Sequence, residues 1–228
     1  MSVAQTTPAT HWFDAFPLET AAQAATAICK SWEFLISRPL HFNGRMKEPR
    51  LTKAIKIHVE QVTAWEAGLL GMWACENVIG MMDETTGKVT EERRTDISYG
   101  WTDAQVGFQL VFEFKKLTRH ARSRAAYVGS SGMGRFVTGI YSKAQPVAAM
   151  VGMMVDPYEN VVPALIEAIE SPASIAALKS IVDGGKVCKS PSTLFNEAEF
   201  DTDHARPAKL APNHGTIRIA HLLLPFPT

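Results

Sequence analysis

Residues 106–117, VGFQLVFEFKKL, carry the clearest strand pattern in the chain. Side chains alternate between the two faces of a strand. One face is apolar and holds Phe108, Leu110, Phe112 and Phe114, and the other holds Gln109, Val111, Glu113 and Lys115. The pattern predicts that the phenylalanines anchor a core while Glu113 and Lys115 lie side by side on the opposite face.

The segments around this strand predict helices as well as strands. A shorter alternation predicts a strand over residues 93–99, and the apolar run 146–155 predicts a strand covered on both faces. Residues 216–224, TIRIAHLLL, indicate a last strand. Helical spacing is found at 18–37, 51–80, 132–142 and 159–182, with a polar loop near 83–92 and a turn near 100–103. The order predicts a mixed α/β or α+β layered domain.

Length and composition are those of an ordinary globular protein. The chain has 228 residues, 46% hydrophobic residues and a formal net charge of +0, with a pI near 7.1. A neutral protein has no global attraction for polyanions, so any contact with nucleic acid requires a local basic patch. We expect a helical N-terminal extension over residues 1–45 and one domain over residues 46–228.

The cysteines and the N-terminus indicate a cellular location. Cys29, Cys75 and Cys188 are odd in number and widely spaced, which favours reduced thiols over disulfides or a structural zinc site. No stretch approaches the roughly 20 apolar residues of a membrane span, and no basic region followed by an apolar run begins the chain. These features predict a soluble, cytoplasmic protein with no membrane contact.

Asp96 is a second acid that can lie close to the pair Glu113 and Lys115. If the strand over 93–99 pairs with the strand over 107–116, an acid directly across the ladder lies within about 5 Å at Cβ. Two carboxylates that close repel each other unless a cation separates them, and a hard divalent ion such as Mg²⁺ suits oxygen ligands. Asp96 and Glu113 are therefore the candidate ligands of Mg²⁺ or Mn²⁺. Lys115 is the candidate for assisting a water or offsetting phosphate charge.

Asp96 followed by Glu113-Phe114-Lys115 resembles the bipartite motif of the PD-(D/E)XK nuclease superfamily, whose fold is restriction-endonuclease-like. The family core runs helix, three strands, helix, strand, whereas the sequence shows two clear strands before the helix at 132–142. The third is expected at 125–128 or within 70–80. The motif departs from the family in lacking a proline before Asp96. The resemblance implies a further acid on the first core helix, either Glu48 or Glu60.

A basic run follows the motif and is a candidate for binding the phosphate backbone. It comprises Lys116, Arg119, Arg122 and Arg124, with Arg135 on the next helix as a phosphate contact or a surface salt bridge. Residues 127–142, YVGSSGMGRFVTGIYS, resemble the corresponding helix of bacterial defence nucleases. The resemblance implies a metal-dependent nuclease acting on nucleic acid, with DNA expected, as the effector of an anti-phage or restriction system. Target choice would rest with a protein partner or a dimer mate.

The alternative is a non-catalytic interaction subunit that keeps the fold. Its binding surface would be the helical N-terminus and the Met- and Trp-rich segment 65–82, which otherwise fills a core or a subunit interface. His204, His214 and His221 lack the short spacing of zinc ligands, so we expect core or hydrogen-bonding roles. Glycines 129, 132 and 134 match no nucleotide-binding fingerprint.

Overall fold

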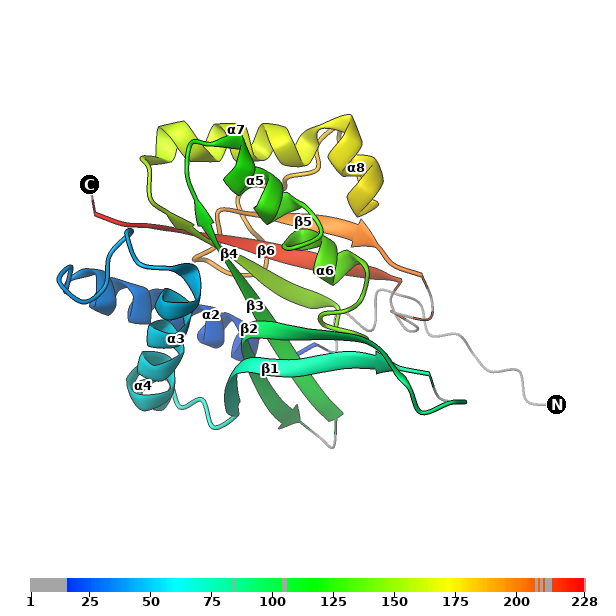
Figure 1. Cartoon of the computed structure of the whole chain (residues 1–228), viewed down its shortest axis with the longest axis horizontal. Helices are drawn as coiled ribbons and strands as arrows, with labels where there is room; N and C mark the ends of the chain where they lie inside the picture. The colour runs from blue at the N-terminus through cyan, green and yellow to red at the C-terminus, as the bar shows by residue number, and fades with distance from the viewer. Residues whose placement is uncertain are drawn as a thin grey trace.

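The computed structural model describes residues 16–83, 85–103, 106–207, 209, 211 and 215–227. In this part of the chain, six strands form one open sheet in the order β1-β2-β3-β4-β6-β5 (Figure 1). The strands are β1 (Met72–Met82), β2 (Val89–Asp103), β3 (Val106–Leu117), β4 (Val147–Met154), β5 (Phe200–Ala205) and β6 (Thr216–Pro225). Neighbours are antiparallel except β3–β4 and β4–β6, which are parallel. The sheet is mixed, so the predicted mixed α/β class is confirmed.

The two strands with the strongest sequence patterns lie in the interior of the sheet. All eight residues of β4 are buried between β3 and β6, as its uninterrupted apolar run predicts. On β3 the apolar face, which includes Phe112 and Phe114, belongs to one core cluster. Val111 and Leu117 on the opposite face belong to the other. Glu113 and Lys115 therefore enter the second core from the face that the alternation assigns to them.

The first face of the sheet is covered by the N-terminal helices. These are α2 (Leu18–Ile36) and α3 (Glu48–His58), which continues through a π-helical turn (Val59–Thr63) into α4 (Ala64–Glu66). Their apolar residues Ile28, Trp32, Leu51 and Ile55 share one cluster with β3. Trp32 Nε1 donates to the Pro225 carbonyl at 3.1 Å, so α2, within the predicted extension 1–45, packs onto the last strand.

The second face is covered by the later helices. They are α5 (Ala121–Val128), α6 (Met133–Val137), α7 (Tyr158–Glu170) and α8 (Pro172–Leu178). Figure 1 shows them on the side of the sheet opposite α2 and α3. The crossover from β3 to the parallel strand β4 runs through α5 and α6, as a parallel connection requires. No single helix among the described residues is long and apolar enough to cross a membrane.

Two predicted elements are wrong in type or length. The helix predicted over 51–80 ends at Glu66, and residues 72–82 form β1, where Trp73 is buried and Met72 is exposed. Of the two places where a third strand before α5 was expected, the structure has the one within 70–80. Residues 121–128 form α5, so the strand option at 125–128 is wrong. A short apolar run fits both the helical and the strand spacing. For residues 72–82, pairing with β2 selects the strand.

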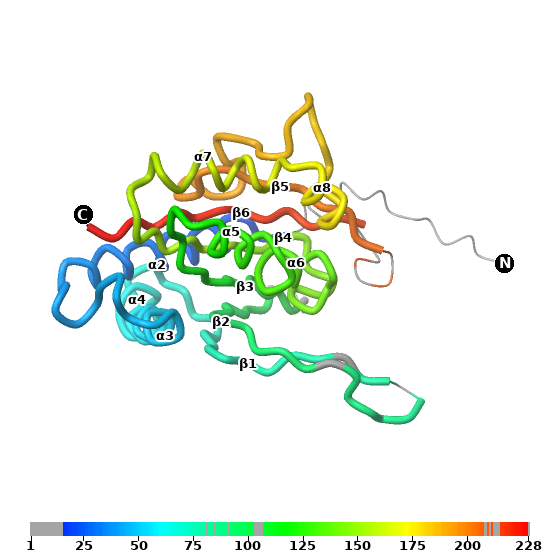
Figure 2. Tube along the Cα trace, turned by 45° about the horizontal axis from the view of Figure 1, so that its top comes forward, coloured from blue at the N-terminus to red at the C-terminus, as the bar shows by residue number. Residues whose placement is uncertain are grey.

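Other boundaries move for local reasons. The polar loop predicted at 83–92 is largely a hairpin, since β2 begins at Val89, and the turn expected near 100–103 falls within β2 (Figure 2). The helix predicted over 132–142 is only α6, residues 133–137. Gly139 and Ser142 have left-handed φ values of 76° and 53°, which a continuing helix does not allow, and buried Arg206 donates to the carbonyls of Phe136, Tyr141 and Ser142. Strand β5 was not predicted.

Candidate active site

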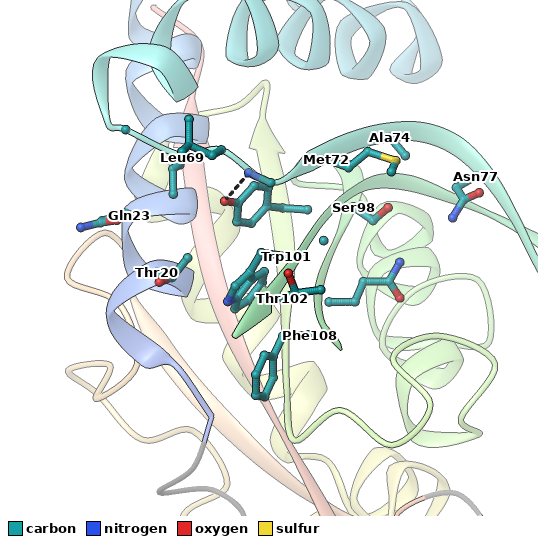
Figure 3. Close-up of a pocket in the computed structure, with 16 residues that line it drawn as sticks. Thr20, Gln23, Leu69, Met72, Ala74, Asn77, Ser98, Trp101, Thr102 and Phe108 are labelled. Atoms are coloured by element: carbon teal, nitrogen blue, oxygen red, sulfur yellow. Dashed lines mark hydrogen bonds between the residues drawn. The ribbon is translucent and has the colours of Figure 1, made fainter. Parts of the chain in front are cut away.

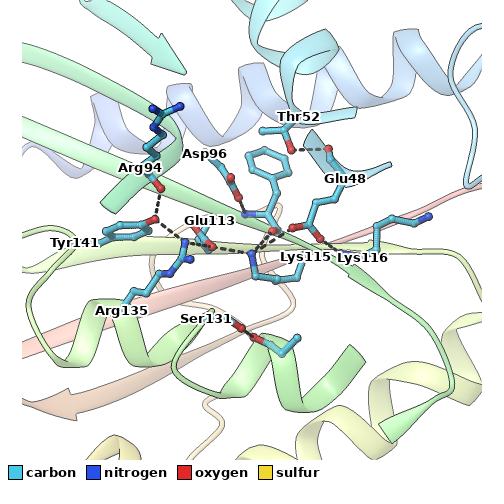
Figure 4. Close-up of polar contacts among 12 residues, drawn as sticks. Glu48, Thr52, Arg94, Asp96, Glu113, Lys115, Lys116, Ser131, Arg135 and Tyr141 are labelled. Carbon is cyan, nitrogen blue, oxygen red and sulfur yellow. Dashed lines mark hydrogen bonds and ion pairs between the residues drawn. The ribbon is translucent and has the colours of Figure 1, made fainter. Parts of the chain in front are cut away.

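Asp96 lies where β2 stops pairing with β3 and where its pairing with β1 is interrupted at one position. The β2–β3 pairing ends at Ile97 and Phe112, one residue before Asp96 would face Glu113. On the other side, the β1–β2 partners are Cys75–Ile97 and Asn77–Thr95, and the intervening Glu76 has a left-handed φ of 54°. The Asp96 side chain fills the resulting gap, and its Oδ2 accepts the Phe114 amide at 2.8 Å (Figure 4).

Glu48 accepts a second β3 amide in the same way, two residues further along the strand. Its Oε2 accepts the Lys116 amide at 2.8 Å. The amides of Phe114 and Lys116 are two residues apart, so they point to the same edge of β3, beyond the last pair with β2. A buried amide needs an acceptor, and here two carboxylates supply it in place of a neighbouring strand. Because Glu48 is the first residue of α3, its bond to the Lys116 amide attaches that helix to the sheet.

Lys115 joins the acids to one another. Its Nζ donates to Glu113 Oε1 at 2.7 Å, to the Phe114 carbonyl at 2.9 Å and to Glu48 Oε1 at 3.3 Å. The side chain is 11% exposed, whereas that of Glu48 is 29% exposed. Burial lowers the pKa of Lys115, but Glu113, Glu48 and Asp96 outweigh it and raise that pKa above its usual value. Lys115 is therefore a cation at neutral pH.

A second cation reaches the same carboxylate from the crossover. Arg135 on α6 donates to Glu113 Oε1 at 2.8 Å and to the Tyr141 hydroxyl at 2.6 Å. The Tyr141 hydroxyl donates in turn to the Arg94 carbonyl on β2. Figure 4 shows the four side chains, from Tyr141 through Arg135 and Glu113 to Lys115, in one row. The row connects α6 to the two strands that carry the acids.

Glu113 is the most constrained group of the cluster. Its side chain is fully buried, and its Oε2 has no hydrogen-bond partner in the described part of the chain. Burial, and then the nearby charge of Asp96, raise the pKa of Glu113 to about 7. Burial also raises the pKa of Asp96, although Lys115 and the Phe114 amide oppose it. A buried carboxylate oxygen without a partner is costly and calls for a functional explanation.

This arrangement fits a divalent cation bound by few protein ligands. Glu113 Oε2 is a buried ligand oxygen without a partner among the described residues, and the charge of Asp96 is close enough to raise the pKa of Glu113. No three His, Cys, Asp or Glu side chains in the described chain are assembled as a metal site. Mg²⁺ commonly binds one or two carboxylates and completes its shell with water and phosphate oxygens. Two carboxylates meet that requirement.

The structure brings Asp96, Glu113, Lys115 and Glu48 together, as their predicted roles require. Glu60, the other choice for the helix acid, is exposed and pairs with Lys56 at 2.7 Å. Of the two roles expected for Arg135, the structure shows a salt bridge, but its partner is the buried Glu113 and not a surface acid. Tyr141 was missed as a site residue because it fitted the apolar helical stripe; its hydroxyl was the only signal.

The side chains of the predicted basic run differ in their contacts and in their exposure. Lys116 donates through Nζ to the carbonyls of Gly44 and Met46 at 2.6 and 3.1 Å, which fixes the chain before α3. Arg124 is partly buried and donates to the Arg119 carbonyl at 2.7 Å. Arg119 and Arg122 are exposed at the start of α5. These two side chains are the members of the run best placed to meet a phosphate.

His204 and His221 lie in a different cluster, in the core between β5, β6 and the later helices. Both are fully buried. Thr202 Oγ1 lies 2.8 Å from His204 Nε2 and 3.0 Å from His221 Nε2. The Tyr127 hydroxyl lies 2.9 Å from His221 Nδ1. The predicted hydrogen-bonding role is confirmed for these two, and His214 lies outside the described residues.

Comparisons with known proteins give no relative. No family model matches the chain, and neither a curated protein nor a solved structure matches it. The chemistry of the cluster therefore rests on its own geometry: three acids, a protonated lysine and an arginine meet where β2 and β3 stop pairing, around one buried carboxylate oxygen that has no partner among the described residues.

Proposed function

We propose that the protein is a metal-dependent nuclease with a PD-(D/E)XK core. One observation carries the proposal: the carboxylate of Glu113 is buried beside Lys115 and near Asp96, yet its Oε2 has no partner. A purely structural ion pair would use both oxygens, because an unpaired buried oxygen lowers stability. An open donor next to a second acid is what a cation-binding site requires.

The order of elements supports the proposal. The superfamily core runs helix, three strands, helix, strand, and the chain runs α3, β1, β2, β3, α5 with α6, then β4. The strand missing from the sequence pattern is β1, and it pairs with β2. Glu48 lies at the start of the first of these helices and contacts Lys115, as the resemblance implies for the acid on the first core helix.

Each residue has a separate task in this proposal. Asp96 and Glu113 would hold the ion, which would supply Lewis-acid chemistry at the phosphate and the attacking water. Because its pKa is raised, Lys115 keeps its proton at Nζ and stabilises negative charge developing on the phosphate instead of accepting a proton. Glu48 and the Phe114 carbonyl fix the Lys115 ammonium beside Glu113.

The substrate and the biological role follow from the resemblance and are part of the proposal. Nucleic acid, with DNA favoured, would lie across the opening between β2 and β3, where exposed Arg119 and Arg122 offer phosphate contacts. The role is that of the nuclease of a bacterial anti-phage or restriction system, with a partner or dimer mate choosing the target.

The test is plasmid cleavage with Mg²⁺, Mn²⁺ or EDTA. The wild-type protein should cut with either ion and not with EDTA, and Asp96→Asn and Lys115→Ala should each reduce the rate by about 100-fold or more. Asp183→Asn and Lys186→Ala repeat the same chemical changes in an exposed turn and should retain the rate. Cleavage that persists in both site variants would remove the assignment.

The second candidate, a non-catalytic interaction subunit, is favoured by one surface. Large apolar side chains are exposed around α4 and the start of β1: Trp65, Leu70 and Met72 are 72%, 86% and 75% exposed. Such side chains in one region are typical of a protein contact. Absence of cleavage under every metal condition, together with a stable complex lost in Trp65→Ser, would favour this candidate.

A further inference from the structure

Two cavities on the surface differ in the charge of the residues that line them. The larger, about 690 Å³, lies at the start of β1 beside α2, and no described residue that lines it carries a charge (Figure 3). Two of its aromatic residues, Trp101 and Phe108, pack against the core on the α2 face of the sheet. The smaller, about 410 Å³, lies before α3 and is lined by Arg45, Lys47 and Arg50 with Asn43 and Met46. Only the lining of the smaller cavity has a charge that attracts anions.

The three cations of the smaller cavity, here called the basic loop (Arg45, Lys47 and Arg50), lack an acid partner in the described part of the chain. All three are exposed, and their side chains form no ion pair or hydrogen bond with another described residue. Like charges around one cavity repel one another. In a protein whose formal net charge is +0, this local excess of positive charge is a footprint for a polyanion.

The basic loop is fixed beside the candidate active site by bonds to two consecutive residues of β3. Lys116 Nζ donates to the carbonyls of Gly44 and Met46 at 2.6 and 3.1 Å. Glu48, the acid within the same segment, directs both of its oxygens to β3, where Oε1 accepts Lys115 Nζ and Oε2 accepts the Lys116 amide. Because Glu48 is engaged in this way, it holds the loop in place and leaves the three cations facing solvent.

Arg119 and Arg122 lie at the same end of β3 as the basic loop. They follow Leu117, the last residue of β3, and are exposed at the start of α5. The Leu117 carbonyl accepts the Val155 amide at 2.9 Å. A Cβ added to Gly44 would lie 3.2 Å from Val155 Cγ1, so the loop before α3 packs at the same place. Exposed cations from two separate segments therefore gather next to the candidate active site.

We propose that the basic loop binds backbone phosphates of the nucleic-acid strand whose reacting phosphate lies at Asp96 and Glu113. This inference rests on the proposed nuclease function and adds a second binding surface for its substrate. Successive phosphates of a strand advance about 3.4 Å along the helix axis. Cations fixed next to Glu48 therefore meet phosphates only a few nucleotides from the reacting one. Phosphate contacts position a substrate without reading its bases, so the loop accepts any sequence.

The test measures binding in EDTA, where metal-dependent cleavage cannot interfere. A fluorescein-labelled DNA duplex of about 20 base pairs is titrated with protein between about 50 and 200 mM salt and followed by anisotropy. The triple variant Arg45→Gln, Lys47→Gln, Arg50→Gln loses three phosphate contacts. The slope of log affinity against log salt should therefore fall in magnitude by about 2–3, and the affinity at about 100 mM salt by about 30-fold or more.

Lys143→Gln, Lys179→Gln and Lys186→Gln together are the matched control. They remove the same charge from exposed positions that line neither cavity, so they should change the slope by less than about 1. Arg50→Gln alone should lower the slope by about 1 and replaces the triple variant if that proves unfolded.

Equal losses in the two triple variants, or no binding by the wild type at the lowest salt, overturn the proposal. Binding to phosphatidylserine vesicles that depends on the basic loop, without binding to the duplex, also overturns it and assigns the loop to a membrane surface. Loop-dependent duplex binding without plasmid cleavage would refute the nuclease and retain the basic loop. Plasmid cleavage with equal binding losses in the two triple variants would refute the loop and retain the nuclease.

Discussion

Two buried polar clusters lie on the same side of the sheet, and they differ in how completely they are paired. In the histidine cluster (Tyr127, Thr202, His204 and His221) each polar atom has a partner. In the acid cluster (Glu48, Asp96, Glu113, Lys115 and Arg135) Glu113 Oε2 has none. A satisfied neutral network stabilises a fold, whereas an open charged one indicates a site.

Hydrogen positions in the histidine cluster follow from one carbonyl. His204 Nδ1 lies 3.0 Å from the Leu178 carbonyl, which can only accept, so Nδ1 carries the proton. His204 Nε2 therefore accepts from Thr202, whose oxygen accepts from His221 Nε2, and His221 Nδ1 accepts from Tyr127. Both rings are neutral. Burial lowers the pKa of His204 to about 4, and it also lowers the pKa of His221 well below its usual value.

The largest expected effect is on catalysis in the acid cluster. Glu113→Gln should reduce metal-dependent cleavage by about 1000-fold, because the proposed ligand is lost. Its free energy of unfolding at pH 8 should be equal to or higher than that of the wild type, since a buried carboxylate with a raised pKa is replaced by a neutral amide. Cleavage rates and urea unfolding measure the two. A destabilised variant with normal cleavage would make the cluster structural.

The next effect is on stability in the histidine cluster. Thr202→Val leaves His204 Nε2 and His221 Nε2 without partners, so the free energy of unfolding should fall by about 2–4 kcal/mol. Cleavage per folded molecule should not change. Thr85→Val, at an exposed position whose amide alone is bonded, is the control and should shift stability by less than about 0.5 kcal/mol. Equal stability of the two variants would contradict the pairing.

The two clusters should also respond oppositely to acid. Because His204 and His221 have lowered folded pKa values, the stability they contribute is present above about pH 6.5 and is lost as the pH falls toward 4. Glu113 has a raised pKa, so its contribution is present below about pH 4.5 and is lost as the pH rises through 7. Between about pH 4.5 and 6.5, the stability contributed by Glu113 therefore falls as the pH rises, whereas the stability contributed by the histidines increases.

Removing Glu113 should make the acid loss of stability steeper, by about 1.4 kcal/mol per pH unit between pH 5 and 6.5. His204→Phe should make the same curve shallower by a similar slope. Urea unfolding at half-unit pH steps measures both. Parallel curves for wild type and Glu113→Gln would show that this carboxyl does not keep its proton in the folded protein.

The smallest expected effect is stabilisation by the ion alone. Mn²⁺ at five times its dissociation constant should raise the free energy of unfolding by about 1 kcal/mol in wild type and in Thr202→Val. Asp96→Asn should show no such rise. Thermal unfolding with and without Mn²⁺ measures the shift without any substrate. An equal rise in Asp96→Asn would place the ion elsewhere.

The sequence predicted the parts of the site that one strand can encode. Alternation in residues 106–117 places Glu113 and Lys115 on one face, and that holds in the structure. Strand β1 was predicted as helix, because Trp73, Cys75 and Val78 fit both the helical and the strand spacing. Pairing with β2 makes this segment a strand. Glu48 was expected as the helix acid, with Glu60 as its rival. Only the docking of α3 against the Lys116 amide distinguishes them.

By itself, the sequence determined the elements whose pattern is local: the alternating strand β3, the apolar strand β4 and the amphipathic helices that cover them. The tertiary structure alone decided that β2 ends its pairing at Ile97, so that Asp96 and Glu48 accept the amides β3 would otherwise leave unpaired. It also decided that Arg135 turns inward to Glu113. The physical reason is that a periodic pattern fixes which face a side chain occupies, whereas its partner depends on how far apart the chain segments are held.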